Sequence, residues 1–284
     1  MNRLSSLASI LASFALCSIV SWHGGRLAVA DESPAKPPGT RTALEEYVAR
    51  PDSHYAWRVV KKARGSEATV YLLDMKSQAW RSEDEVDRTV WQHWLTVVCP
   101  DEIACSTGML LIGGGSNDGR PPNKPDKPIV EIALATRSVV AELGMVPNQP
   151  LVFHDDGKRR GEDDLIAYTW DQFLKTGDAN WPARNPMVKS AVRAMDTIQA
   201  LTVREQGGKR RIDRFVVAGG SKRGWTTWLT GAVDPRVTAI IPIVIDVLNV
   251  NVSMKHHRAA YGFWAPAVGD YERHEIMDRM DTPE

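Results

Sequence analysis

The sequence predicts an α/β fold with a mostly parallel sheet, helices on both of its faces and an antiparallel hairpin at its start. Apolar stretches such as 109–112 and 213–218 alternate with segments of helical periodicity such as 187–206, an order typical of a parallel sheet. The turn residues Arg64-Gly65-Ser66 separate two extended stretches, as in a hairpin. The nearly continuous apolar run at 237–245 is typical of a central parallel strand.

The start of the chain is expected to lie outside this fold. The apolar stretch 7–20 follows Arg3 and precedes the small residues Ala28-Val29-Ala30, the arrangement of a signal peptide and its cleavage site. The same stretch is alternatively an uncleaved membrane anchor, although a bilayer span needs a longer one. We expect residues 1–30 to be a signal peptide and 31–41 a flexible proline-rich lead. The mature protein is then periplasmic or secreted, without a stable membrane anchor.

The remainder, residues 42–284, is long enough for one large domain. The chain has 35 basic and 35 acidic side chains and a formal net charge of zero, so it offers no basic surface for a polyanion. We therefore expect a small-molecule or peptide substrate as its partner, and no nucleic acid. No residue spacing predicts a metal or an organic cofactor.

The domain is predicted to begin with a short helix and three strands. Thr42 and Glu45, three residues apart, form the capping box that begins a helix. Stretches rich in β-branched and aromatic residues at 55–60, 68–75 and 91–98 predict the strands. We expect the tryptophans here to pack between the strands, with stacking on a ligand as the alternative; they are Trp57, Trp80, Trp91 and Trp94.

Cys99 and Cys105 are the cysteines outside the expected signal peptide. In an exported protein an even pair is typical of a disulfide, and Pro100-Asp101 between them suggests a turn that brings them together. A zinc site is the alternative, but histidine ligands are missing nearby. We predict a disulfide.

The strand at 109–112 runs into Gly113-Gly114-Gly115. Glycine-rich loops in this position expose backbone N–H groups that hold an oxyanion in esterases. A phosphate-binding loop or a plain turn is the alternative. A Walker loop is excluded because Gly119-Arg120-Pro121 stands where Gly-Lys-Ser/Thr is needed, and the prolines nearby exclude the helix of a dinucleotide fingerprint.

Three further elements are predicted before the strand at 213–218. Apolar residues recur at helical spacing from Pro128 to Leu143, and Gly144 ends this helix. The apolar stretch 151–153 predicts a fourth strand that ends at His154. Residues 165–174 then form an amphipathic helix.

The strand at 213–218 continues into Gly219-Gly220-Ser221 and a segment of helical character. A strand that turns sharply through Gly-x-Ser-x into a helix is the nucleophile elbow of α/β-hydrolases. The match is partial, because Arg223 stands two residues after the serine and glycine follows only at Gly224. The alternative is an ordinary strand–turn–helix connection in which Ser221 caps the helix.

The run at 237–245 ends in Asp246. This position is a candidate for a catalytic acid, with a loop-fixing aspartate as the alternative. The residues that follow are expected to be an irregular polar and aromatic tail that includes His256 and His257.

Long phrases of the sequence together resemble one family, the PhoPQ-activated pathogenicity-related proteins, which are exported members of the α/β-hydrolase superfamily. They include PDSHYAWRVV at 51–60, IGGGSNDG at 112–119, MVPNQPLVFHDD at 145–156 and GGSKRGWTTWLTGAVDPRV at 219–237. The resemblance covers about residues 42 to 275. It implies Ser221 as the nucleophile and marks Arg223 as the family's own form of the elbow. Family members continue further, with an acid and a histidine after the serine, so we expect a truncated chain whose sheet lacks its last strands.

The expected site centres on Ser221, with the backbone N–H of Lys222 and that of Gly114 or Gly115 holding the oxyanion. The remaining candidates are wall residues for the substrate, namely His154, Arg223, Trp225, His256 and His257. The side chains of Lys222 and Arg223 are candidates for recognising an anionic group, or they form salt bridges with nearby aspartates. We expect an exported serine hydrolase of the esterase or peptidase type. The alternative is a non-catalytic binding or signalling protein on the same scaffold.

Overall fold

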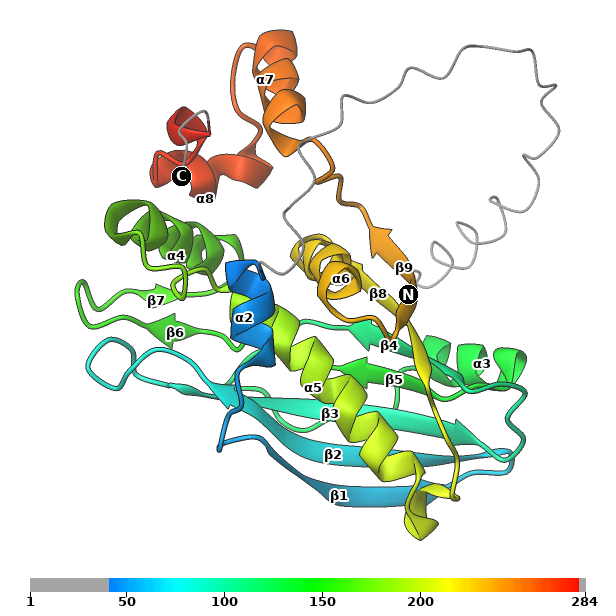
Figure 1. Ribbon diagram of the computed structural model, residues 1–284. Helices are drawn as coiled ribbons and strands as arrows, with labels where there is room; N and C mark the ends of the chain where they lie inside the picture. The colour runs from blue at the N-terminus through cyan, green and yellow to red at the C-terminus, as the bar shows by residue number, and fades with distance from the viewer. Residues whose placement is uncertain (1–40, 281–284) are drawn as a thin grey trace, which may run out of the picture. The chain divides into compact units, whose positions relative to one another are not determined.

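A computed structural model describes residues 41–280 of the protein. The expected signal peptide and nearly all of the proline-rich lead lie outside these residues. The domain is built on a seven-stranded sheet in the order β1-β2-β3-β5-β4-β8-β9 (Figure 1). Its strands are β1 (Ala56–Arg64), β2 (Ala68–Ala79), β3 (Val90–Pro100), β4 (Thr107–Ile112), β5 (Val140–Leu143), β8 (Arg214–Gly220) and β9 (Val237–Ile243).

The sheet has an antiparallel half and a parallel half. The pairs β1–β2, β2–β3 and β3–β5 are antiparallel, and the pairs β5–β4, β4–β8 and β8–β9 are parallel. The predicted α/β fold and its opening hairpin are confirmed, and the antiparallel part extends beyond the hairpin to β3 and β5.

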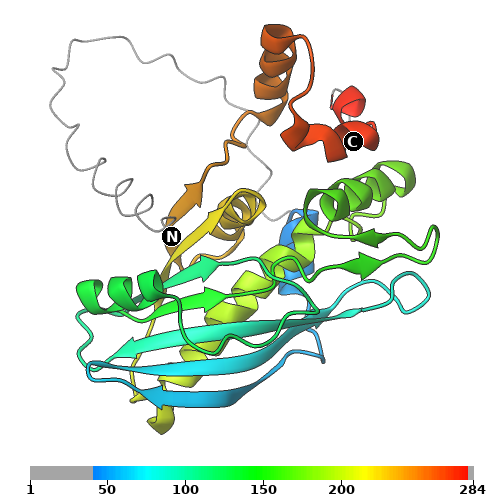
Figure 2. The same cartoon turned by 180° about the vertical axis from the view of Figure 1, so that it is seen from behind.

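Helices cover both faces, as predicted. On one face lie α2 (Ala43–Ala49), α5 (Arg184–Thr202) and α6 (Lys222–Val233), whereas α3 (Lys127–Thr136) lies on the other (Figures 1 and 2). The helix α5 is buried over most of its length and forms the main core with β2, β3 and β8. Burial of this apolar face is the main force that holds α5 on the sheet. The capping box of Thr42 and Glu45 is present at the start of α2, as predicted.

The strand order reverses beside β4. From β4 the chain passes through α3 to β5, and it later returns through α5 to β8 on the opposite side of β4. In parallel sheets a ligand crevice forms at the carboxyl ends of strands at such a reversal. The glycine-rich loop follows β4 and Ser221 follows β8, and the register pairs Ile112 with Gly219. The two predicted site loops therefore leave the sheet side by side.

The helix predicted from Pro128 to Leu143 is wrong in its second half. The helix α3 ends at Thr136, where Arg137 adopts a left-handed conformation with φ 47° and its N–H donates to Ala133 O and Leu134 O. Val140 to Leu143 then form β5 between β3 and β4. Periodicity alone does not distinguish a buried four-residue strand from the end of a buried helix.

The predicted fourth strand lies outside the main sheet. Leu151–Val152 is β6, which pairs with β7 (Arg159–Arg160) in a separate hairpin. The predicted helix at 165–174 is confirmed within α4 (Glu162–Thr176).

The expectation of an irregular tail is wrong. The tail contains α7 (Val250–Tyr261) and α8 (Gly269–Arg273), with 3₁₀ turns at Pro266–Val268 and Met277–Arg279. No residue of α7 is buried, so the apolar stripe on which a sequence-based helix assignment depends is weak here. Within residues 41–280, no helix is both long enough and apolar enough to cross a bilayer.

The predicted disulfide is not formed. Cys99 is a free thiol buried in the core at the end of β3, and Cys105 is a free thiol exposed before β4. Burial raises the pKa of Cys99 to about 11. Cys99 serves as a small core residue, because its strand directs it inward while Cys105 faces solvent.

Candidate active site

Ser221 lies at the junction of β8 and α6 in a sharp turn. Its backbone has φ 54° and ψ −125°, a conformation that non-glycine residues seldom adopt. Its N–H donates to Ile243 O at 2.9 Å, and its carbonyl accepts from Trp225 N at 3.1 Å. The side chain is exposed and makes no capping hydrogen bond to α6. A capping serine therefore does not describe this residue, which instead occupies a sharp turn from strand to helix.

Two glycines allow strand and helix to approach at this turn. A Cβ on Gly219 would lie 2.6 Å from Arg223 O, and a Cβ on Gly224 would lie 2.9 Å from Gly219 O and 2.5 Å from Ile245 Cγ2. All three distances are shorter than van der Waals contact. The second glycine is thus needed three residues after Ser221, where α6 meets β8 and β9, which accounts for the Gly-x-Ser-x-Arg-Gly form of the elbow.

Ser221 opens into a pocket of about 580 Å³, here called the Ser221 pocket. Its walls come from α4, α5, α6, the segment after β9 and the tail, and its aromatic side chains are Trp170, Trp225 and Tyr271. Trp170 meets both other rings edge to face, with centroid distances of 6.0 and 6.3 Å. The pocket is therefore largely aromatic and apolar, and its charged lining residues are Asp163, Arg184, Lys222, Asp246 and Arg279. Trp225, predicted as a wall residue, lines it.

The side chains of Lys222 and Arg223 form salt bridges. Lys222 Nζ lies 2.7 Å from Glu162 Oε2 and 3.0 Å from Asp163 Oδ2, and Arg223 Nη2 lies 2.7 Å from Glu162 Oε1. Burial opposes ionisation of Glu162, but hydrogen bonds from Arg223, Lys222 and Gln149 outweigh it and lower the pKa to about 2. The positive charges of Lys222 and Arg223 are thus neutralised by carboxylates of the protein.

The same network holds the glycine-rich loop beside the elbow. A Cβ on Gly114 would lie 2.6 Å from Arg223 Nη2, so a side chain there would require the guanidinium to shift. Arg223 Nε donates to Val146 O at 2.6 Å. Gln149 Nε2 donates to Gly115 O at 3.1 Å and also to Glu162. Gly114 and Gly115 border a second pocket of about 230 Å³ and are not walls of the Ser221 pocket.

The predicted histidines lie away from Ser221. His154 is exposed in the β6–β7 turn, with Nδ1 3.2 Å from Asp84 O, and His256 is exposed on α7. His257 Nε2 accepts from Ala265 N at 3.1 Å and its ring is stacked with Trp264. None of these three lines the Ser221 pocket.

Asp246 does line the Ser221 pocket. Its Oδ1 accepts from Leu248 N at 3.2 Å, two residues further on. This hydrogen bond fixes the loop, as the alternative for Asp246 predicted. Asp246 also lies in the same pocket as Ser221.

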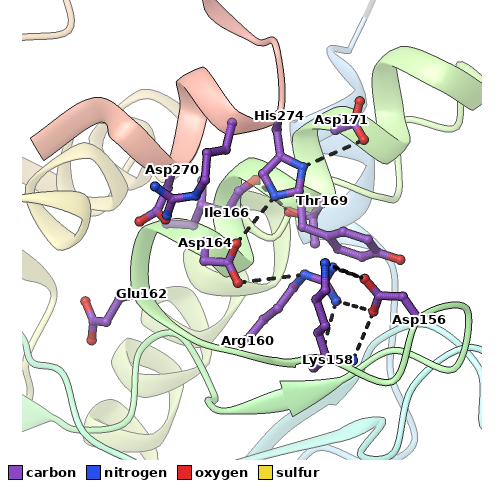
Figure 3. Close-up of polar contacts among 12 residues, drawn as sticks. Asp156, Lys158, Arg160, Glu162, Asp164, Ile166, Thr169, Asp171, Asp270 and His274 are labelled. Atoms are coloured by element: carbon purple, nitrogen blue, oxygen red, sulfur yellow. Dashed lines mark hydrogen bonds and ion pairs between the residues drawn. The ribbon is translucent and has the colours of Figure 1, made fainter. Parts of the chain in front are cut away.

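The tail is fixed to α4 by a group of charged residues that sequence reasoning missed. Figure 3 shows His274 between Asp164 and Asp171, at 3.4 and 3.9 Å. Arg279 Nη2 lies 2.6 Å from Asp171 Oδ1, and Tyr271 OH donates to Asp163 at 3.0 Å. These contacts place the tail over the pocket. No sequence signal identified them, because the paired residues are more than 100 positions apart.

The acidic residues after His154 are also engaged. Asp155 accepts from Tyr168 OH at 2.8 Å, and Asp156 forms an ion pair with Arg160 (Figure 3). In the part of the chain that the structure describes, no group of three or more His, Cys, Asp or Glu side chains is arranged to hold a metal ion.

Arg184 is a further residue that the sequence did not single out. It begins α5, is only 9% exposed and lines the Ser221 pocket. Its Nη1 donates to Lys222 O at 3.0 Å, and its guanidinium lies 3.8 Å from the centroid of the Trp225 ring. An arginine within an otherwise helical pattern is usually exposed, so only the fold shows that this one is buried.

Comparisons with known proteins identify the family of the chain. The family model for PhoPQ-activated pathogenicity-related protein matches residues 44–284. The chain is 42% identical over 248 residues to autocrine proliferation repressor protein A of Dictyostelium discoideum, covering 86% of this chain and 49% of that protein. It thus spans about half the length of this curated relative.

Solved structures give weaker likenesses. Acetyl xylan esterase from Paenibacillus sp. R4 matches with a TM-score of 0.42 and 12% identity, covering 81% of this chain and 69% of that chain. A cold-adapted esterase from an Arctic intertidal metagenomic library matches with a TM-score of 0.35 and 16% identity, covering 65% and 64%. The α/β fold itself is assigned from the strand order and from the helices on both faces of the sheet. By the match over residues 44–284, the chain belongs to the family of PhoPQ-activated pathogenicity-related proteins.

Proposed function

We propose that the protein is an exported serine hydrolase of the esterase or peptidase type, with Ser221 as its nucleophile. The observation that carries the proposal is the backbone of Ser221, held at φ 54° between β8 and α6 with its side chain exposed at a pocket. Such a conformation costs on the order of 1 kcal/mol or more and is found mainly at functional sites. It aims a hydroxyl at a ligand instead of at the helix end.

The proposed reaction is acyl transfer to Ser221 followed by hydrolysis. Ser221 Oγ attacks the acyl carbon, the bond to the leaving group breaks, and water then cleaves the acyl-enzyme and restores the hydroxyl. The N–H of Lys222, first residue of α6, would hold the oxyanion together with an N–H of Gly114 or Gly115. Gly114 and Gly115 border the second pocket, and the pairing of Ile112 with Gly219 and the close approach of Gly114 to Arg223 bring their loop beside the turn at Ser221.

A base must accept the proton of Ser221, and an acid must orient that base. Asp246 is proposed as the acid because it lines the same pocket. His154, His256 and His257 are not proposed as the base, because each lies elsewhere. Export is proposed from the signal-like pattern of residues 1–30.

A fluorophosphonate probe tests the nucleophile, because it phosphonylates an activated serine. We expect the protein to be labelled at Ser221 and the labelling to disappear in Ser221→Ala. Ser66→Ala, a change at an exposed serine in the β1–β2 turn, is the matched control and should label like the wild type. A folded protein that does not react with the probe would contradict the proposal.

A second candidate is a secreted signalling protein that uses the hydrolase scaffold without catalysis. Two observations favour it: the relative from Dictyostelium is called an autocrine proliferation repressor, and no described histidine lines the Ser221 pocket. It predicts that Ser221→Ala keeps the biological effect of the purified protein on cell growth, whereas a hydrolase would lose it.

A further inference from the structure

We infer that the Ser221 pocket takes an acyl ester that carries a carboxylate, and that Arg184 binds this carboxylate. The hydrolytic part of the inference rests on the proposed function of Ser221. The anion site rests on the surroundings of Arg184 and can be tested without catalysis.

Three cations lie at the elbow, and two of them are already neutralised. Lys222 pairs with Glu162 and Asp163, and Arg223 pairs with Glu162. Neither has a free positive charge to offer to a ligand. Anion recognition, for which Lys222 and Arg223 were candidates, is therefore assigned to the third cation, Arg184.

Arg184 is buried, yet no carboxylate among residues 41–280 lies within 4.0 Å of its guanidinium. Its direct contacts are neutral: Lys222 O, the Trp225 ring and the hydroxyl of Tyr271. The carboxylate of Asp163, which pairs with Lys222, acts on Arg184 only from beyond 4.0 Å. Burial lowers its pKa to about 10, so it still carries a charge at neutral pH. Buried charges in proteins are normally paired with an opposite charge. An anionic ligand would supply that charge.

The donors of Arg184 suit a carboxylate. A guanidinium has five N–H donors in a planar fork, and the contacts named above use only part of them. Because Arg184 lines the pocket, the remaining donors are available to a ligand there. A bidentate pair with a carboxylate is the arrangement that this fork favours.

The position of Arg184 limits the length of the ligand. Its Nη1 is bonded to the carbonyl of Lys222, the residue that follows Ser221. One short chain can therefore join the acyl carbon at Ser221 to a carboxylate at Arg184. The surrounding walls include Trp170, Leu174 and Met254, which suit methylene groups. Half-esters of short dicarboxylic acids have this chemistry.

Hydrolysis of such a half-ester needs no reactant other than water. Ser221 Oγ forms a bond to the acyl carbon as the bond to the leaving group breaks, and the hydroxyl proton of Ser221 leaves with the alcohol or phenol. Water then adds to the acyl carbon, releases the dicarboxylate and returns the proton to Ser221. Arg184 touches only the distal carboxylate, so it is a specificity-determining residue.

The test compares two esters that differ in the distal charge, the mono-4-nitrophenyl ester of adipic acid and 4-nitrophenyl heptanoate. We expect kcat/KM corrected for spontaneous hydrolysis to favour the adipate ester by on the order of tenfold or more, as for a charged hydrogen bond. Arg184→Met should bring this ratio to about one, and Arg184→Lys should retain part of it. An unchanged ratio in Arg184→Met would overturn the inference.

Arg193→Met is the matched control. Arg193 lies on the same helix and also covers an aromatic ring, with its guanidinium 4.9 Å from the Tyr55 centroid, but it is paired with Asp196 away from the pocket. It should keep the wild-type ratio. If Arg193→Met also brings the ratio of the two kcat/KM values to about one, the preference depends on α5 as a whole and the assignment to Arg184 is wrong.

Binding of free adipate separates this inference from the proposed function. We expect saturation-transfer NMR to show adipate bound to Ser221→Ala and not to Ser221→Ala with Arg184→Met. If this binding result is obtained but the wild type hydrolyses neither ester, the proposed hydrolase function is wrong and the anion site at Arg184 is supported. If Arg184→Met does not fold, adipate should slow probe labelling of the wild type more than uncharged adipamide does. Equal effects would overturn the inference.

Discussion

Ser221 and the glycines around it show how single residues shape the site. Ser221 accepts an unfavourable backbone conformation, and Gly219 and Gly224 are the positions where a side chain would collide with neighbouring backbone. Gly220, directly before the serine, has open space where its Cβ would be. A side chain is thus tolerated at Gly220 but not at Gly219.

We predict that Gly219→Ala disrupts the elbow and that Gly220→Ala does not. The new methyl group of Gly219→Ala would lie 2.6 Å from Arg223 O, which we expect to cost about 2 kcal/mol or more in free energy of unfolding and to abolish probe labelling. Urea denaturation and the labelling rate measure both effects. Equal behaviour of the two variants would show that the close approach at Gly219 is not what sets the turn.

Glu162 is the residue on which the elbow and the glycine-rich loop converge. It accepts hydrogen bonds from Lys222, Arg223 and Gln149, and Gln149 in turn bonds to Gly115 O. Its pKa is lowered from 4.5 to about 2. A depressed carboxyl pKa stabilises the fold above the unfolded pKa, and this stabilisation is lost as the pH falls through the folded pKa.

Glu162→Gln should therefore be less stable than the wild type at neutral pH, and the difference should shrink between about pH 4.5 and pH 2. Denaturant titrations across this range measure it. Glu131→Gln, in an exposed pair with Lys127, is the control and should differ little from the wild type at any pH. A Glu162→Gln penalty that does not change with pH would argue against the ionised carboxylate as its source.

At the scale of elements, the tail segment around α8 depends on charged contacts with α4. Asp171 is nearly buried and accepts from Lys175 and Arg279. Tyr271 and His274 add contacts to Asp163 and Asp164. Because few apolar residues of this segment are buried, these polar contacts carry much of its docking.

We expect Asp171→Asn to loosen the tail. Loss of a nearly buried carboxylate with two cationic partners typically costs about 2 kcal/mol or more, so amide hydrogen exchange in residues 269–279 should become on the order of tenfold faster. Asp270→Asn removes only a local pair with Arg273 and should leave the exchange rate nearly unchanged. Similar exchange in both variants would mean that other contacts hold the tail.

At the scale of the whole molecule, the position of β9 differs from its sequence pattern. Its apolar run is typical of a strand buried on both faces, yet β9 lies at the edge of the sheet that residues 41–280 form. Ile241 is 46% exposed, and Val244 and Leu248 after it are exposed as well. An apolar edge strand pairs readily with other chains.

Ile241→Lys should therefore reduce concentration-dependent association, measured by light scattering of the purified protein. Val203→Lys is the control, because Val203 is 54% exposed at the end of α5 and not on an edge strand. If both changes reduce association equally, general surface charge is responsible and the edge is not.

Several elements could be predicted because their signals are local in the sequence. The capping box of Thr42 and Glu45, the hairpin with its glycine turn and the glycines of the elbow each depend on interactions within a few residues. The long apolar periodicity of α5 also identified it, because a buried face repeats every turn. The prediction of Ser221 as the nucleophile rests on signals of the same local kind.

Contacts between groups far apart in the chain could not be predicted and are seen only in the folded protein. The segment predicted as one helix at 128–143 forms α3 and β5. Cys99 and Cys105 are unpaired, and none of the predicted histidines lines the Ser221 pocket. Lys222 is neutralised by carboxylates from α4, and Arg184 is buried beside it. These outcomes depend on strand order and on contacts between residues far apart in the chain, and local patterns of charge and hydropathy do not encode such contacts.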